Sequence, residues 1–443
     1  MKTKILLSVA IVLVIGLAAG AFWWLRRPQV ITFSDDSKVT LLAVEYGKRH
    51  APPNVKVPAA STTARTAAAR RVNGSFTTTN DTLVLWVRQE FDATQNQFHN
   101  FQYFVYDQAG TACVGNSMMR AGNGPQGNSI TAIQLDAFPR RQGKFVVRAL
   151  ENGNGGQEMS DQKFVIANPV HGAFANWTAE PLPATKEDDD LSVTLTKLAA
   201  GADSPFQRDQ DDPDDPANKG VQATFTVSQN GKPVTNWRPV SIETSDATGN
   251  HVNGLVNGLV GGFNNGLRQG DDGAVTYQWG LWPDEPAWKL RVGFSEQSGY
   301  SDSEVWSVQN IPLEPGRRQD FMNGVRSNTN SVFAEADLNG VHVKIFPGKL
   351  FTDAAANSRQ AGGFQMQITP PLPAGLQLTI VKLTDDQGED VQRNGTSVSR
   401  SATSSTYGYL FNDLGNAKSL NFTIALHKSH FFEFTVKPET EKP

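Results

Sequence analysis

The sequence predicts an all-β protein, in which three tandem immunoglobulin-like antiparallel β-sandwich domains follow one N-terminal transmembrane helix. Three observations lead to this prediction: apolar and polar residues alternate in many short runs, one turn motif recurs at a fixed spacing, and an uncharged apolar segment lies near the N-terminus. Alternation with a period of two is typical of strands that bury one face. A chain of 443 residues has room for about two or three domains of ordinary size.

The N-terminal segment is long enough to cross a membrane once. Ile5–Leu25 contains 21 residues without a charge, and as a helix it would span roughly 31 Å. Arg26 and Arg27 end the segment, and we expect a signal anchor in a single-pass cell-membrane protein, with residues 1–4 in the cytoplasm. The alternative is a signal peptide cleaved near Ala19–Ala21, which would leave a secreted or periplasmic protein. Both interpretations place the rest of the chain outside the cytoplasm.

A turn motif recurs three times at equal spacing. Asp-x-x-Gly begins at Asp107, Asp246 and Asp385, and both 246 − 107 and 385 − 246 equal 139. The carboxylate can accept hydrogen bonds from local amides and glycine allows a positive φ, so each copy predicts a strand, a tight turn and another strand. Each copy is preceded by an alternating run that ends at glycine and is followed by two strands that close at a proline. The strand pairs are Lys144–Leu150 with Lys163–Pro169, Trp288–Phe294 with Val305–Pro312, and Leu420–His427 with Phe431–Pro438.

The three copies of this unit predict three domains. Pro181–Asp190 and Ile311–Gly316 contain the prolines that are expected at domain junctions. We place β-sandwich copy 1 at 29–168, copy 2 at 169–312 and copy 3 at 313–443.

Composition and motifs exclude several classes of protein. The 40 Lys+Arg and 44 Asp+Glu residues give a net charge of −4, which argues against a nucleic-acid-binding protein. The single cysteine, Cys113, excludes an intrachain disulfide, and we expect it to be a small buried residue. The sequence contains no His-Glu-x-x-His, Gly-x-Ser-x-Gly or phosphate-binding loop motif. We therefore expect a protein that is not an enzyme and has no cofactor.

Charge is concentrated in two segments. Residues 26–71 carry nine basic and three acidic residues, so this segment could lie on anionic lipids or form a solvated domain face. Residues 186–219 carry ten acidic and four basic residues. Part of this acidic segment could bind Ca²⁺, but we favour a solvated loop, because the glycine and the closing glutamate of an EF-hand are missing. The candidate metal ligands are Asp209, Asp211, Asp212, Asp214 and Asp215.

Two segments are candidates for partner binding. An apolar-tipped loop is expected within residues 251–273, and Leu255, Leu259 and Phe263 are its candidate binding residues. Trp282 lies in a loop flanked by proline, where we expect exposure more than at Trp279 or Trp288. An exposed ring there could stack on a sugar or a protein partner, although packing in the core or at a strand end is the favoured interpretation of this group of tryptophans.

The other aromatic and imidazole side chains of interest have simpler explanations. Trp279 and Trp288 are expected to pack at a strand end and in the core. His427 and His430 flank a predicted hairpin turn, and we favour a solvated hairpin over a metal site because no third ligand lies nearby in the sequence.

One short segment resembles a known group of proteins. Val39–His50 is similar to a segment of uncharacterised exported bacterial multi-domain β-sandwich proteins, which implies a place in the bacterial cell envelope. We therefore predict a membrane-anchored extracytoplasmic binding or scaffold protein whose partner is an envelope protein or a cell-wall glycan. The alternatives are an array of carbohydrate-binding modules and a hydrolase with dispersed carboxylates.

Overall fold

The protein is built from β-strands. The computed structural model describes residues 29–53, 75–90, 100–114, 118–120, 128–153, 156–170, 172–203, 219–255, 268–269, 274–277, 280–296, 298–316, 332–351, 361–373, 375–391, 393–401, 403–411 and 414–440. Within these residues all regular secondary structure is β-strand, which confirms the predicted all-β class. The predicted anchor Ile5–Leu25 lies outside them, and within them no helix is long and apolar enough to cross a membrane.

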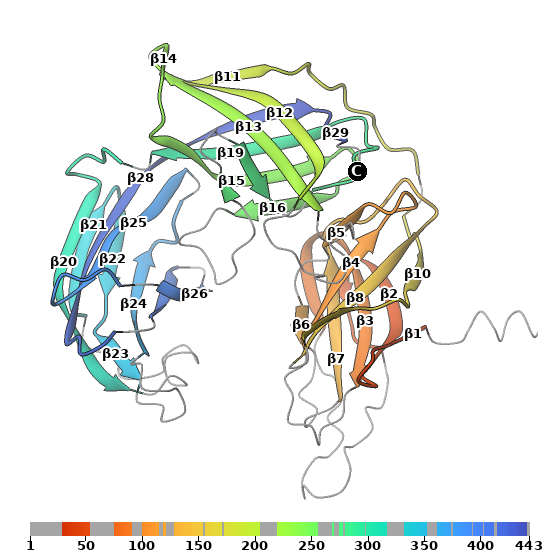
Figure 1. Cartoon of the computed structure of the whole chain (residues 1–443), viewed down its shortest axis with the longest axis horizontal. Helices are drawn as coiled ribbons and strands as arrows, with labels where there is room; N and C mark the ends of the chain where they lie inside the picture. The colour runs from red at the N-terminus through yellow and green to blue at the C-terminus, as the bar shows by residue number, and fades with distance from the viewer. Residues whose placement is uncertain are drawn as a thin grey trace, which may run out of the picture. The chain divides into compact units, whose positions relative to one another are not determined.

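The chain divides into two compact units, of which unit 1 is formed mainly by residues up to 175 and unit 2 mainly by the rest (Figure 1). Side-chain contacts connect separate segments of unit 1. The Phe33 ring lies 5.4 Å from the Phe101 ring, and the Gln89 side-chain amide donates a hydrogen bond of 2.9 Å to the Tyr103 hydroxyl. One sheet has the order β1 (Val30–Thr32), β2 (Lys38–His50), β3 (Phe76–Glu90), β7 (Asn128–Leu135) and β6 (Met118–Arg120). The other has the order β10 (Phe164–Ala167), β8 (Lys144–Gly153), β4 (Asn100–Tyr106) and β5 (Ala112–Val114), with β9 (Gly156–Met159) on β8.

Unit 2 contains a smaller and a larger sheet. The smaller sheet has the order β11 (Ala184–Asp188), β12 (Leu191–Asp203), β13 (Lys219–Gln229), β18 (Ala274–Tyr277) and β17 (Arg268–Gln269), with β14 (Lys232–Pro233) on β13 and β29 (Glu439–Thr440) on β12. The larger sheet has the order β16 (His251–Leu255), β15 (Trp237–Asp246), β19 (Trp288–Glu296), β28 (Ser419–Val436), β20 (Val305–Gly316), β23 (Gly348–Phe351), β24 (Ala361–Thr369), β22 (Val341–Ile345) and β21 (Ala334–Leu338). Three further strands extend it, β25 (Leu376–Asp385) on β28, β27 (Ser405–Phe411) on β24 and β26 (Arg393–Arg400) on β27.

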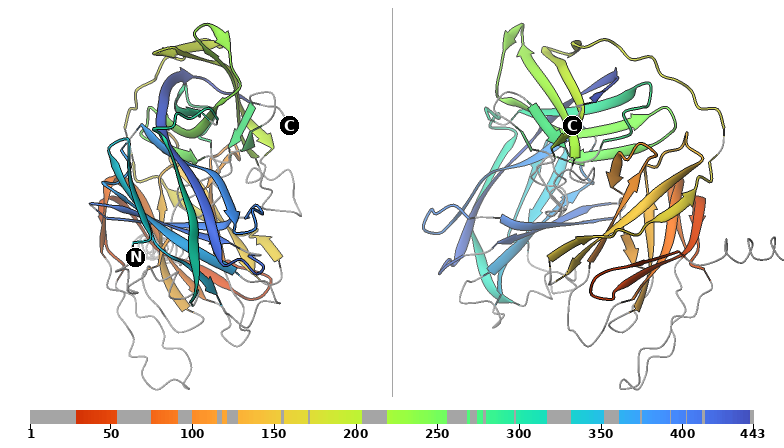
Figure 2. Two further views of the ribbon diagram at one scale, coloured as in Figure 1. Left: turned by 90° about the vertical axis from the view of Figure 1, so that its left-hand side faces the viewer. Right: turned by 45° about the vertical axis from the view of Figure 1, so that its right-hand side comes forward.

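The strand β28 runs without interruption through 18 residues. Its first part pairs with β20 and β25, and its second part, from Ser429, pairs with β19. Figure 1 and the two turned views of Figure 2 show it as one long ribbon that reaches both groups of strands. Because β28 pairs with strands on both sides of residue 312, it connects the residues predicted as copies 2 and 3; the division into three copies stays a prediction.

The predicted hairpin between Leu420–His427 and Phe431–Pro438 is therefore wrong. At the expected turn the backbone is extended and its amides are used by other segments. The Leu426 amide donates to the carbonyl of Glu304, and the Ser429 amide donates to the carbonyl of Gly375, both at 2.8 Å.

The repeated Asp-x-x-Gly turns are confirmed. The Thr111 amide donates to Asp107 Oδ1 at 2.7 Å, and the Glu389 amide donates to Asp385 Oδ1 at 2.9 Å. The motif glycines all have the positive φ that the motif requires. These values are +87° for Gly110, +92° for Gly249 and +86° for Gly388.

The other predicted strands are found, with differences in pairing and extent. Lys144–Leu150 lies within β8 and Lys163–Pro169 contains β10, and these two strands pair as expected. The strands predicted at Trp288 and Val305 are β19 and β20, but each pairs with β28. The two expected junctions are not simple loops, because Pro181–Asp190 contains β11 and Ile311–Gly316 lies within β20.

Candidate functional site

Strand β28 carries two polar side chains on the face that otherwise packs in the core. The inward-facing residues are the even-numbered ones, because side chains alternate between the two faces of a strand. Lys428 and His430 interrupt this apolar row where β28 changes its partner from β20 to β19. The apolar members of the row are Leu420, Phe422, Ile424, Leu426, Phe432, Phe434 and Val436.

The hairpin between β11 and β12 brings carboxylates to this break. The strand register leaves a two-residue turn at Asp189 and Asp190. Asp189 has a φ of +56°, a conformation that Asp tolerates better than most residues. The Asp190 carboxylate accepts hydrogen bonds from Gln229 at 3.0 Å and Asn230 at 3.1 Å, so contacts with the end of β13 also fix the turn.

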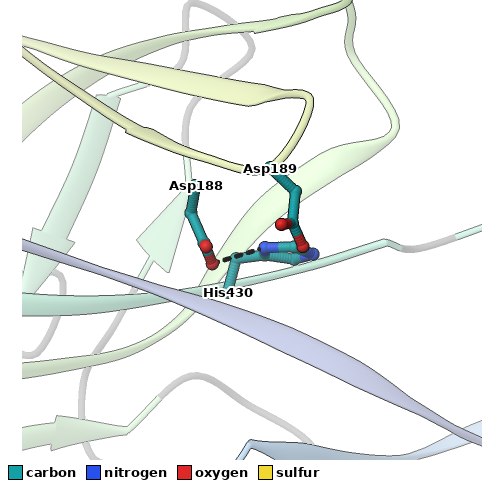
Figure 3. A group of neighbouring side chains, drawn as sticks. All are labelled: Asp188, Asp189 and His430. Atoms are coloured by element: carbon teal, nitrogen blue, oxygen red, sulfur yellow. Dashed lines mark hydrogen bonds and ion pairs between the residues drawn. The ribbon is translucent and has the colours of Figure 1, made fainter.

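Two side chains of β28 each bind one carboxylate of the hairpin. His430 Nδ1 lies 2.7 Å from Asp188 Oδ2, and Lys428 Nζ lies 3.0 Å from Asp189 Oδ2. Figure 3 shows the carboxylates of Asp188 and Asp189 turned toward the imidazole of His430. The His430 side chain is 8% exposed and that of Asp188 is 43% exposed, so the cluster extends from the core to the surface.

The electrostatics of the cluster follow from these pairs. The hydrogen bond and charge of Lys428 hold the pKa of the Asp189 carboxyl below its ordinary value. The same pair raises the pKa of Lys428. The Trp237 ring meets the His430 ring edge to face at a centroid distance of 5.2 Å, and this contact limits the orientations available to the imidazole.

Asp188, Asp189 and His430 are also the residues that could hold a metal ion. One ligand atom from each lies within 4.8 Å of the others. Two carboxylate oxygens and one imidazole nitrogen suit a divalent ion, and three protein ligands leave positions for water. The cluster can therefore act as an ion-paired clasp between the hairpin and β28 or as a cation site.

A second polar cluster contains the other histidine of the predicted turn. His427 is buried, its Nε2 lies 2.9 Å from the Thr379 hydroxyl, and its ring lies 4.7 Å from that of Tyr300. Burial lowers the pKa of His427 below its ordinary value. A hydroxyl paired with an imidazole is the arrangement that activates a nucleophile. The contact joins β25 to β28, because Thr379 lies on β25 and His427 on β28.

The expectation that Trp282 is exposed is wrong. Its side chain is 2% exposed, and its backbone carbonyl accepts a hydrogen bond of 3.1 Å from the indole of Trp288. Trp288 is fully buried at the start of β19, as predicted. Trp282 therefore packs with the core residue Trp288, and it offers no exposed ring for stacking.

The remaining candidate residues lie beyond the part of the chain for which a placement is described. Leu255 ends β16, but its side chain is not among those described. Leu259, Phe263 and Trp279 lie outside the described residues. The same holds for the candidate calcium ligands Asp209, Asp211, Asp212, Asp214 and Asp215.

The sequence did not single out Asp188 or Asp189 as site residues, and it placed His430 beside a predicted hairpin turn. A signal was nevertheless present, because the apolar alternation keeps the same phase on both sides of Lys428. A hairpin with a two-residue turn at 428 and 429 would pair Ile424 with Glu433 and Phe422 with Thr435, so apolar and polar side chains would share a face. An uninterrupted strand avoids this mismatch.

No family model matches the chain, and no curated protein matches it.

Proposed function

We propose that the protein is a non-enzymatic scaffold or binding protein of the bacterial cell envelope, held to the membrane by Ile5–Leu25 with its β-domains outside the cytoplasm. The uncharged length of this segment and the basic segment that follows support the anchor. The β-sandwich character supports domains of immunoglobulin-like type.

The observation that carries the proposal is the continuity of β28. A scaffold has to keep its parts at a fixed spacing, and a flexible linker between domains does not do this. In unit 2 a single strand supplies hydrogen bonds to β19 at one end and to β20 and β25 at the other. Bending at the junction would break backbone hydrogen bonds of Leu426 and Ser429, so this part of the chain is suited to bearing a load.

The polar cluster at the junction supports a structural role as well. Asp188 is engaged by His430, and Asp189 is engaged by Lys428. These pairs fasten the β11–β12 hairpin over the point where the apolar row of β28 is interrupted.

The proposed partner-binding surface consists of Leu255, Leu259 and Phe263, and this assignment stays a prediction. Replacing all three by Ser should abolish capture of the partner from envelope extracts while the melting temperature stays unchanged. A lower melting temperature would identify these residues as core residues. A carbohydrate-binding array has lost its main support, because Trp282 is buried.

The location is tested by the mass of the mature protein in membrane and soluble extracytoplasmic fractions. The proposal predicts an intact N-terminus in the membrane fraction. A chain that starts near Ala21 in the soluble fraction would contradict the anchor and would favour a secreted binding protein.

A further inference from the structure

We propose that Asp188, Asp189 and His430 bind a divalent transition-metal ion such as Zn²⁺, and that the ion fastens the β11–β12 hairpin to β28. The three residues come from the two sides of this contact, so an ion between them would cross-link segments that lie far apart in the sequence. This inference goes beyond the scaffold role, because it makes the stiffness of unit 2 depend on metal.

The geometry allows such an ion with small movements. Ligand atoms around a tetrahedral zinc lie about 3.4 Å apart when each bond is about 2.1 Å long. The three ligand atoms already lie within 4.8 Å of one another, and Asp188 and His430 are in direct contact. Asp189 lies at the tip of an exposed turn, where a rotation of its side chain meets little resistance.

The ligand set also selects the kind of ion. Imidazole favours Zn²⁺ and related transition metals over Ca²⁺ and Mg²⁺, which prefer oxygen ligands alone. His430 is more than nine-tenths buried and is packed against Trp237, so it presents a positioned nitrogen at the surface of the core. The four consecutive acidic residues Glu187 to Asp190 give the hairpin a negative potential that attracts cations.

Lys428 is the competitor of the metal. Its ammonium group lies 3.0 Å from Asp189 Oδ2 and is paired with a carboxylate that would otherwise bind the metal ion. The Lys428 side chain is 61% exposed, so it can turn into solvent when an ion arrives. Removal of this ammonium group should therefore strengthen metal binding, whereas removal of a ligand should weaken it.

Isothermal titration of the full-length protein in detergent with ZnCl₂ tests the site. The proposal predicts one saturable site that is weakened at least about tenfold in both Asp189→Asn and His430→Gln. Lys428→Met should bind Zn²⁺ several-fold more tightly than the unchanged protein. Asp189 is exposed, so Asp189→Asn decides the test even if His430→Gln does not fold.

A matched control is available on the β21–β22 hairpin. His342 there contacts Asp337 at 2.8 Å and Glu335 at 3.4 Å, but through opposite ring nitrogens and with a side chain that is 34% exposed. His342→Gln should leave zinc binding unchanged. The proposal is overturned if the unchanged protein shows no saturable zinc binding. It is equally overturned if Asp189→Asn binds zinc as tightly as the unchanged protein.

Discussion

His430 Nδ1 lies 2.7 Å from Asp188 Oδ2, although 242 residues separate the two in the chain. Asp188 ends β11, the first described strand of unit 2, and His430 lies on β28, which only the two-residue strand β29 follows. This hydrogen bond covers the one break in the inward-facing apolar row of β28. The contact therefore joins the beginning and the end of unit 2 at the place where β28 changes partners.

Loss of this contact should weaken unit 2. His430→Gln is expected to lower the free energy of unfolding by about 1–2 kcal/mol, because it removes a buried side chain that is hydrogen-bonded to a carboxylate. Urea unfolding of the full chain measures this difference. Asp189→Asn is the comparison, because it removes only the exposed ion pair with Lys428, which contributes little in solvent, and it should lower the unfolding midpoint much less. Equal effects of the two substitutions would contradict the clasp.

The second half of β28, from Ser429 to Val436, should stabilise the core of residues 169–312, which the sequence repeat assigns to copy 2. The Phe434 ring packs 6.2 Å from that of Phe225 on β13 and is fully buried. Phe434→Ala should cost about 3–5 kcal/mol, because it leaves a cavity in this core. Glu433→Ala, on the outward face of the same strand, should change the stability by less than about 0.5 kcal/mol. Thermal unfolding of both variants provides the comparison.

The Asp-x-x-Gly turn offers a clean test of backbone conformation. Gly110 and Gly143 both lie in unit 1, and a Cβ atom added at either would meet nothing within 4 Å. Only Gly110 has a positive φ, of +87°. Gly110→Ala should therefore cost about 1 kcal/mol or more, whereas Gly143→Ala should be neutral or slightly stabilising. Similar midpoints in chemical denaturation would refute the role assigned to the motif glycine.

The buried His427 should make the protein sensitive to acid. Burial lowers its pKa in the folded state, so on acidification the unfolded chain binds the proton first. Its contribution to stability is complete above the ordinary histidine pKa of about 6.5 and is lost as the pH falls from there through the lower folded value. His427→Gln, which does not titrate, should flatten the stability curve below about pH 6.5. Urea midpoints between about pH 7.5 and 5 measure the two slopes, and parallel curves would contradict this.

The sequence predicted those parts of the fold that depend on local chemistry. The three Asp-x-x-Gly turns and the strands around them were found, because turn residues and alternation act over a few neighbours. The prediction of a hairpin at His427 to His430 was wrong, because this short polar run within an apolar strand has the same composition as a turn. The phase of the alternation carried the correct information, since it does not change across Lys428.

The candidate site could not be predicted in the same way. Asp188 and His430 meet through strand pairings over more than two hundred residues, and neither residue carries a local motif for the other. Trp282 was misplaced for a related reason, because its loop sequence is typical of the surface whereas its side chain packs beside Trp288. Non-local pairing of this kind depends on the whole core.

Native-state amide hydrogen exchange along β28 tests directly whether this strand is continuous. In a continuous strand the amides of Leu426 and Ser429, which donate to Glu304 and Gly375, should exchange as slowly as those of Phe422 and Phe434. Residues 420–436 would then form one protected block. Two protected blocks separated by rapid exchange at 426–430 would contradict a continuous strand and would remove the basis for the scaffold role.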